Sequence, residues 1–290
     1  MAGQTQTRHE DSLRKRFVLI GDPVGHSWSP KIFNEAFRAL GMEASYEARK
    51  VPPDALSGCL DLIREGEFAG ANVTIPHKQR VAKHVDSLSG DAAVVGAVNT
   101  IVVEAQNRLR GENTDIAGFL KPLREAEGKV AQHDVLILGS GGVARAAAYA
   151  LLRDHLHKRL FIAARTPEKA EAIRSDFSFH DGNDCIQPVE WSERTEKLSS
   201  VGLIVNATPL GMWPHTHESP LPDEAPIASH HIVYDLVYNP NQTRLLKQAQ
   251  NASARIITGF EMLLNQAAAA FKLWTGREMP ADIVRSSLSP

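Results

Sequence analysis

The stretch DVLILGSGGVARAAAYALL, residues 134–152, decides the fold of the second half of this chain. It begins with an apolar run typical of a buried strand and ends in an alanine-rich segment typical of a helix. Between them lies a turn rich in glycine, where backbone amides can approach a pyrophosphate and the helix start supplies partial positive charge. The stretch therefore predicts a dinucleotide site, with a tight packing turn as the alternative. The predicted contacts are Gly139, Ser140, Gly141, Gly142, Val143 and Ala144.

Strands and helices continue to alternate after this turn. Apolar runs recur at 159–165, 201–208, 230–237 and 254–259, and a helical pattern covers 167–177. Strands separated by helices are typical of a parallel sheet with helices on its faces. The second half is therefore predicted to be a Rossmann-like dinucleotide-binding domain.

The end of the strand at 159–165 indicates which nucleotide is bound. Proteins that select NAD carry an acidic residue there, which accepts hydrogen bonds from the ribose hydroxyls. This chain has no carboxylate at that point but has Arg165 and Thr166, with Lys169 close behind. A guanidinium suits the 2′-phosphate of NADP, so NADP is the predicted cofactor. The alternative is that Arg165 is an ordinary solvated residue at a strand end.

The first half has a different α/β pattern. Strands are predicted at 17–20, 45–51 and 68–74, with helices at 30–40 and 53–64, and Ser29 is the expected cap of the first helix. Two extended segments then flank a turn at 106–107, which predicts a mixed sheet. A helix at 115–127 follows.

Four segments are expected along the chain. The alanine- and leucine-rich helix at 261–276 is expected to pack back on the first domain. The segments are a disordered tail (1–16), a substrate-binding and catalytic domain (17–127), a nucleotide-binding domain (128–258, with a hinge near Gly128) and a C-terminal helical segment (259–290).

Composition excludes several functions. With 32 basic and 34 acidic side chains the net charge is -2, which lacks the basic excess that binding to nucleic acid needs. No apolar run approaches the ~20 residues that cross a bilayer, and the polar N-terminus does not resemble a secretory signal, so a cytoplasmic location is expected. No spacing of histidines or cysteines indicates a metal site. A monomer or a homodimer is expected, without a choice between them.

Polar residues at the ends of apolar runs in the first half could bind a substrate. Ser27 and Ser29 stand at a helix start, where hydroxyls and free amides suit a carboxylate. Lys78 and Asp115 follow two other predicted strands. On these residues alone, simple capping by Ser29 is the alternative to carboxylate binding. For Lys78 and Asp115, the residues alone favour an ordinary surface ion pair.

Eight motifs together resemble one family. In order they are GDPVGHSWSP (21–30), NVTIPHK (72–78), AVNT (97–100), GENTD (111–115), LGSGGVARA (138–146), NATPLGM (206–212), DLVYNP (235–240) and GFEMLLNQ (259–266). They resemble the successive motifs of shikimate dehydrogenases over about residues 17–285. The resemblance implies an NADP-dependent oxidoreductase that reversibly reduces 3-dehydroshikimate to shikimate, in the shikimate pathway of aromatic amino-acid biosynthesis.

The resemblance also implies roles for single residues. Lys78 and Asp115 match the catalytic pair, and Ser27 with Ser29 match the residues that hold the substrate carboxylate. The implied contacts to the substrate ring are Thr74, Asn99, Asp115, Tyr238 and Gln266. The implied cofactor contacts are the glycine turn, Arg165, Thr166, Lys169, Thr208, Gly259 and Met262.

The chain departs from the family at two places. Ala164 stands where many members have Asn before the Arg-Thr pair, which removes one adenosine contact. Pro209-Leu210 replaces a pair of small serines, which predicts a stiffer loop near the nicotinamide. Three questions stay open: whether quinate is the substrate or a second one, whether the protein is a non-catalytic NADP-binding sensor, and whether lysine or aspartate is the formal acid and base.

Overall fold

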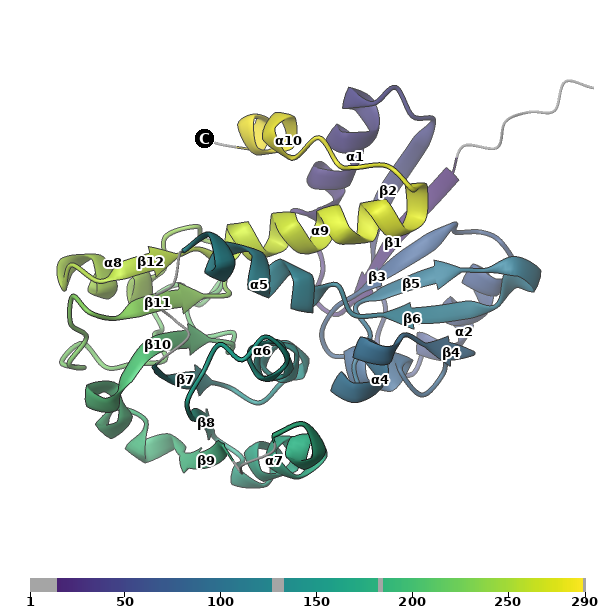
Figure 1. Ribbon diagram of the computed structural model, residues 1–290. Helices are drawn as coiled ribbons and strands as arrows, with labels where there is room; N and C mark the ends of the chain where they lie inside the picture. Colours follow the sequence, from purple (N-terminus) through teal and green to yellow (C-terminus); the bar gives the residue numbers. More distant parts are fainter. Residues whose placement is uncertain (1–14, 127–132, 182–184, 289–290) are drawn as a thin grey trace, which may run out of the picture.

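A computed structural model describes residues 15–126, 133–181 and 185–288. It contains two six-stranded sheets, one from each half of the chain, and a long C-terminal helix that spans both (Figure 1). The tail expected at 1–16 overlaps the first strand by two residues, because Lys15 and Arg16 pair with Ala44 and Ser45. The rest of that tail and the hinge expected at Gly128 lie outside the described residues.

The first sheet is mixed, as predicted, with the strand order β2-β1-β3-β5-β6-β4. Its strands are β1 (Lys15–Gly21), β2 (Ala44–Lys50), β3 (Gly70–Val73), β4 (Ser87–Leu88), β5 (Thr100–Val103) and β6 (Leu109–Glu112). Strand β5 runs antiparallel to both of its neighbours, β3 and β6. The residue before β5 therefore lies at the same edge of the sheet as the residues that follow β3 and β6. This edge carries Thr74, Asn99 and Asp115.

Helices cover both faces of the first sheet. They are α1 (Ser29–Ala39), α2 (Leu56–Arg64), α3 (Lys78–Val81) and α4 (Gly90–Val95), with a 3-10 turn, η1 (Ala105–Asn107), at the predicted turn. The expected cap of α1 is wrong, because Ser29 is the first helical residue and its side chain caps nothing. The Ser27 hydroxyl instead accepts from the Ser29 amide at 3.2 Å. The Ser27 side chain thus accepts a hydrogen bond from the first residue of α1.

The second sheet is entirely parallel, and its order β12-β11-β10-β7-β8-β9 is that of a Rossmann-like dinucleotide-binding fold. Its strands are β7 (Asp134–Leu138), β8 (Leu160–Ala164), β9 (Ile186–Glu190), β10 (Val201–Asn206), β11 (Ile232–Asp235) and β12 (Arg255–Ile257). The sequence did not indicate β9, because Pro188 interrupts its pattern. Proline is accommodated there because β9 is an edge strand that pairs only with β8.

The helices of the second sheet begin at its glycine turn. They are α6 (Gly142–Arg153), α7 (Pro167–Asp181) and α8 (Arg244–Asn251), with 3-10 turns η2 (Trp191–Glu193) and η3 (Glu196–Ser200). Helix α6 follows β7 after the glycine turn, and its nine buried residues lie among α4, α5 and the sheet. Its first turn therefore lies at the carboxyl edge of the strands, where parallel α/β sheets bind ligands.

Helices α5 (Asp115–Glu125) and α9 (Gly259–Thr275) join the two halves, and α10 (Ala281–Leu288) packs on α1 and α9. Helix α5 buries Phe119 and Leu120 in the core of the second sheet, although Asp115 at its start belongs to the edge of the first. Helix α9 buries Leu264 and Phe271 in the core of the first sheet. The C-terminal segment thus returns to the first half, as predicted (Figure 1). Over the described ranges no helix has both the length and the apolar character to cross a membrane.

Gly118 allows α5 and α9 to cross closely. A Cβ at this position would lie 2.7 Å from Cβ of Gln266 and 2.8 Å from the carbonyl oxygen of Met262. We expect Gly118→Ala to lower the free energy of unfolding by ~1–3 kcal/mol, because this clash outweighs the better helix propensity of alanine.

Urea denaturation measures the change, and Gly58→Ala is the matched control. Gly58 lies inside α2, and a methyl group added there would meet nothing within 4 Å, so alanine should be neutral or stabilise by up to ~1 kcal/mol. Equal effects of the two substitutions would contradict the close helix crossing.

Candidate active site

The catalytic pair implied by the sequence is an ion pair in the structure. Lys78 Nζ donates to Asp115 Oδ2 at 2.6 Å, and the two side chains are only 14% and 6% exposed. Lys78 begins α3 after β3, whereas Asp115 begins α5 after β6, so the sheet edge brings together residues 37 positions apart. The carboxylate also lies in the first turn of α5, where the helix dipole favours negative charge.

Lys78 also adjoins the glycine turn of the other half. A Cβ placed on Gly142 would lie 3.4 Å from both Cβ and Cδ of Lys78, and 3.8 Å from Cβ of Ala97. The stem of the lysine therefore passes along the start of α6. Because its ammonium needs only one of three protons for Asp115, it can still donate to another oxygen. The arrangement places a proton donor beside the predicted pyrophosphate site.

Asn99 holds the carboxylate from the other side. Its Nδ2 donates to Asp115 Oδ1 at 2.8 Å and to Thr114 Oγ1 at 2.9 Å, and its Oδ1 accepts from the Thr114 amide at 2.7 Å. Asn99 Nδ2 also donates to Gln266 Oε1 of α9, at 3.4 Å. These contacts fix the orientation of the Asn99 amide. The N–H groups that remain for a ligand include those of Lys78 that do not contact Asp115.

The hydrogen-bonded cluster of Lys78, Asn99 and Asp115 continues through three buried side chains that sequence reasoning missed: Tyr46, Asn72 and Thr100. Tyr46 Oη donates to Asn72 Oδ1 at 2.7 Å, and Asn72 Nδ2 donates to Thr100 Oγ1 at 3.0 Å. Burial raises the pKa of Tyr46, while an interaction with Ser29 lowers it. The polar Asn72 within the otherwise apolar FAGANV run was the available signal, since buried polar side chains need partners.

The serine pair lies between two tyrosines. Ser27 Oγ donates to Ser29 Oγ at 3.2 Å, and Ser29 is buried. Burial raises the pKa of Tyr238, which an interaction with Ser27 opposes. Tyr238 therefore adjoins Ser27 as Tyr46 adjoins Ser29. Thr74 stands one turn before Lys78, and its carbonyl oxygen accepts from the His77 amide at 2.9 Å.

The glycine turn has the geometry that a pyrophosphate needs. Gly139 has φ +114°, and a Cβ there would lie 2.8 Å from the carbonyl oxygen of Ala207, so only glycine fits. Gly141 precedes α6 with nothing within 4 Å of its Cβ position, and no side chain caps the helix. The first helical amides, at Gly142, Val143 and Ala144, therefore have no side-chain cap and are available to a phosphate. The residues fit a dinucleotide phosphate.

The other residues implied for the cofactor lie in different surroundings. Arg165, Thr166 and Lys169 are exposed directly after β8, as a 2′-phosphate site requires. Thr208 is held by its hydroxyl, which donates to Asn206 Oδ1 at 2.7 Å. Met262 is 5% exposed in the core of the second sheet, so its contact with a nicotinamide stays a prediction.

Gly259 supports the same edge by close packing. A Cβ on Gly259 would lie 2.5 Å from the carbonyl oxygen of Val237. The start of α9 can therefore lie against the segment that carries Tyr238. For the residues that the structure describes, no group of three histidine, cysteine or acidic side chains could hold a metal ion.

Asp235 at the end of β11 organises the loops around this edge. Its carboxylate accepts from Asn206 Nδ2 at 2.9 Å, from the Val237 amide at 3.0 Å and from Thr243 Oγ1 at 2.6 Å. Burial raises its pKa to about 6, and the three hydrogen bonds oppose the shift only in part. The folded state therefore holds this proton more tightly than the unfolded chain.

The raised pKa of Asp235 predicts a pH dependence of stability. Because the folded pKa of about 6 exceeds the ordinary 3.8, the free energy of unfolding should fall as pH rises between those values, by ~3 kcal/mol in total. Urea denaturation at pH 4, 5 and 7 measures the fall. Asp235→Asn, which cannot ionise, should lack this component. A wild-type curve parallel to that of the variant would refute the assignment.

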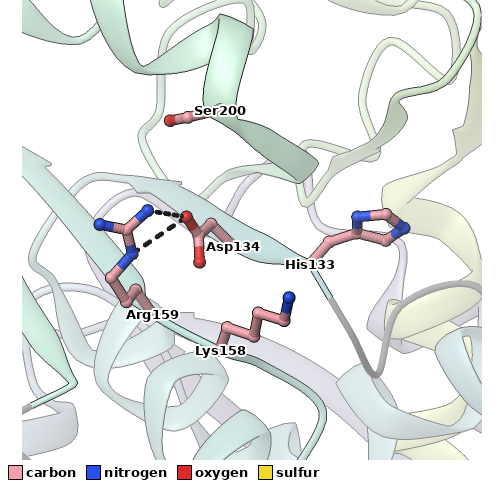
Figure 2. A pocket seen from close by; sticks show the side chains of 5 residues that line it. All are labelled: His133, Asp134, Lys158, Arg159 and Ser200. Carbon is pink, nitrogen blue, oxygen red and sulfur yellow. Dashed lines mark hydrogen bonds and ion pairs between the residues drawn. The ribbon is translucent and has the colours of Figure 1, made fainter.

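The hollow in Figure 2 is separate from this cluster. It measures about 440 Å³ and is lined by His133, Asp134, Lys158, Arg159 and Ser200. These residues precede or begin β7, β8 and β10, so the hollow lies at the amino edge of the second sheet, opposite the glycine turn. Arg159 Nε donates to Asp134 at 3.0 Å, which neutralises its one acidic group. No residue of the predicted site lines it.

Comparison with known proteins identifies the family. The profile of the shikimate dehydrogenase substrate-binding domain matches residues 19–101, and that of the shikimate 5′-dehydrogenase C-terminal domain matches residues 259–288. A shikimate dehydrogenase (NADP(+)) of Salinibacter ruber is 44% identical over 280 residues, 96% of this chain and 98% of the relative. The chain belongs to the shikimate dehydrogenase family.

Solved structures of the shikimate dehydrogenase family and its relatives share the fold. The enzyme from Thermus thermophilus, in complex with NADP(H) and shikimate, superposes with a TM-score of 0.83 at 37% identity, covering 94% of this chain and 98% of that one. A quinate dehydrogenase from Corynebacterium glutamicum, in complex with NAD, superposes with a TM-score of 0.85 at 30% identity, again covering 94% and 98%. The fold is thus common to enzymes named for two substrates and crystallised with two cofactors.

Proposed function

We propose that this protein is an NADP-dependent shikimate dehydrogenase, which reversibly reduces 3-dehydroshikimate to shikimate in aromatic amino-acid biosynthesis. The observation that carries the proposal is the Lys78–Asp115 pair, which is buried and directly adjoins the glycine turn of a dinucleotide-binding sheet. The names of the relatives support the same activity. The first half would bind the substrate and the second the cofactor, with the borders near 128 and 259 predicted from the sequence.

The polar cluster suits a carboxylated ring with several hydroxyls. Ser27 and Ser29 would hold the carboxylate, and Tyr238 would close that end of the ring. Thr74, Asn99, Asp115 and Gln266 would hold the ring hydroxyls, since each lies at or beside the sheet edge that carries the Lys78–Asp115 pair. A planar carboxylate at one end and hydroxyls at the other fix the orientation of the ring.

Reduction of a ketone needs a proton at the oxygen that gains negative charge. The Lys78 ammonium would stabilise this charge and then donate the proton to the oxygen. Asp115 would keep Lys78 aimed at the ring and accept a hydrogen bond from the neighbouring hydroxyl. NADPH, when bound, supplies the hydride. In the reverse direction the same pair would accept the proton from the hydroxyl.

NADP is the proposed cofactor. Arg165 is exposed at the end of β8, and its guanidinium can pair with a 2′-phosphate, with Thr166 and Lys169 as further donors. Ala164 stands where many family members carry asparagine. It is 2% exposed and, being alanine, has no side-chain donor for the adenosine. We therefore expect Arg165 to account for most of the preference for NADP over NAD.

Quinate is the second candidate substrate, because a quinate dehydrogenase is among the structures that superpose on this chain. Measurement of kcat/KM for shikimate and quinate, each with NADP+ and with NAD+, tests the proposal. We expect the shikimate and NADP+ pair to give the highest value. A higher value with quinate would make the protein a quinate dehydrogenase. No turnover with any pair would indicate a non-catalytic NADP-binding sensor. A cytoplasmic location and a monomeric or dimeric state stay predictions.

A further inference from the structure

Arg145 is a buried cation that the proposed reaction does not use. It lies near the start of α6, just after the glycine turn, and its side chain is only 8% exposed. Its Nε donates to the carbonyl oxygen of Val95 at 2.7 Å, and Val95 is the last residue of α4 in the first half. Burial of a guanidinium costs free energy unless its donors are used. This buried group is therefore used for a contact between the two halves.

Further contacts fix the guanidinium of Arg145 in place. Its Nη2 pairs with Asp176 Oδ2 of α7 at 2.8 Å, and its Cζ lies over the Phe177 ring at 5.1 Å. A Cβ placed on Gly96 would lie 3.6 Å from Nη2, so the group also lies against the residue that follows Val95. A planar guanidinium can make all of these contacts at once, whereas an ammonium cannot.

The segment that this guanidinium holds, residues 95–99, leads into the polar cluster. The Val98 amide donates to the carbonyl oxygen of Lys78 at 2.9 Å. Asn99, at the end of the segment, donates from Nδ2 to Asp115 Oδ1 at 2.8 Å. The segment therefore contacts both members of the Lys78–Asp115 pair.

The same segment also packs on the start of α6. A Cβ placed on Gly142 would lie 3.8 Å from Cβ of Ala97, and Gly142 belongs to the proposed pyrophosphate site. Arg145 lies three residues further along the helix. Its contact with Val95 thus fixes how closely the polar cluster and the glycine turn approach each other.

We propose that Arg145 is a positioning residue for hydride transfer. It holds segment 95–99 against α6 and so sets the distance between a ring bound at the polar cluster and a cofactor bound at the glycine turn. Rates of transfer fall steeply when reacting groups are misplaced, by ~10² for a shift of about 1 Å. The inference rests on the proposed function, because this distance matters only if both ligands bind where proposed.

Kinetics of Arg145→Lys test the role, because lysine keeps the charge but lacks the planar group. We expect kcat to fall about tenfold, with the KM values for shikimate and NADP+ within about twofold of the wild type. The isotope effect on kcat with shikimate deuterated at the reacting carbon should rise, since hydride transfer becomes slower relative to the other steps. An unchanged kcat would overturn the proposal. So would a lower kcat with an unchanged isotope effect, which indicates fewer active molecules.

Arg153→Lys is the matched control. Arg153 also joins α6 to α4, through an ion pair with Asp91 at 2.6 Å, but both side chains are exposed. We expect this control to keep the kcat and the isotope effect of the wild type. A loss equal to that of Arg145→Lys would overturn the proposal.

Asp176→Asn is a second variant that leaves the core intact, since the Asp176 side chain is 53% exposed. It removes one anchor of the Arg145 guanidinium and keeps the contact with Val95. We expect kcat to fall about two- to threefold, with a raised isotope effect. An unchanged kcat would contradict the positioning role.

Hydrogen exchange of the ligand-free protein tests the contact without any turnover. The amides of Gly96, Val98 and Asn99 donate to Ala92, Lys78 and Glu112 in the wild type. In Arg145→Lys we expect these three amides to exchange at least about tenfold faster, because their segment loses its anchor, while the amides of β10 keep their wild-type rates.

Two other results of this measurement would contradict the proposal. Unchanged exchange at the three amides would show that Arg145 does not hold the segment, and equally faster exchange in β10 would indicate general destabilisation. Both results judge the positioning role alone, whereas a wild type that does not oxidise shikimate contradicts the proposed function.

Discussion

Lys78→Met should lower kcat for shikimate oxidation by ~10²–10⁴ while KM changes comparatively little. Methionine keeps much of the length of the side chain, so the stem along Gly142 can still pack, but the ammonium that contacts Asp115 is lost. Without it the ketone oxygen gains negative charge with no donor beside it. Steady-state rates with saturating NADP+ give both constants.

Lys272→Met is the matched control for this substitution. Lys272 also pairs with an acidic residue, Glu278, but at an exposed position near the end of α9. Exposed pairs contribute little to stability, and this one contacts none of the site residues. We expect normal kcat and KM from this control. A near-normal kcat for Lys78→Met would refute the role of the lysine.

Asp115→Asn should lower kcat by ~10² and raise the KM for shikimate. The amide can no longer accept from Lys78 with a full negative charge, and its nitrogen must face either Lys78 or the Asn99 amide, both of which donate. The substitution therefore disturbs both the aim of the lysine and the hydroxyl contact. Combined with Lys78→Met, it should add little further loss, because the two residues act as one unit.

The same kinetic assay with Asp154→Asn provides the comparison. Asp154 pairs with Arg124 at the surface, so its loss should leave turnover unchanged. If the losses from Lys78→Met and Asp115→Asn instead multiplied in the double variant, the two groups would be acting independently, contrary to the pair described here.

Much of this fold was predictable because local patterns coincide with the structure. The apolar run before Gly139 favours a strand, and the alanine-rich run after Gly142 favours a helix. A strand, a turn and a helix in that order agree with both preferences. The ends of the strands then determined the site, since residues that follow β3 and β6 meet at one edge. The contact of Lys78 with Asp115 follows from that topology, although the residues alone favoured a surface pair.

The parts that sequence reasoning missed depend on tertiary contacts. Pro188 argues locally against a strand, and only its position at the sheet edge makes β9 possible. Gly118 resembles an ordinary weak point in a helix, yet its importance comes from α9, which lies far later in the chain. Tyr46 and Asn72 belong to two predicted strands, and their polar atoms meet only when β1 pairs with both of its neighbours.

A crystal structure of the wild type with shikimate and NADPH tests the central claim most directly, since both ligands are reduced and cannot react. The account predicts that one ring hydroxyl lies within ~3 Å of both Lys78 Nζ and the Asp115 carboxylate, on the side that faces the nicotinamide. The ring carboxylate should contact Ser27 and Ser29. A shikimate bound elsewhere, or a nicotinamide turned away from Lys78, would contradict the account.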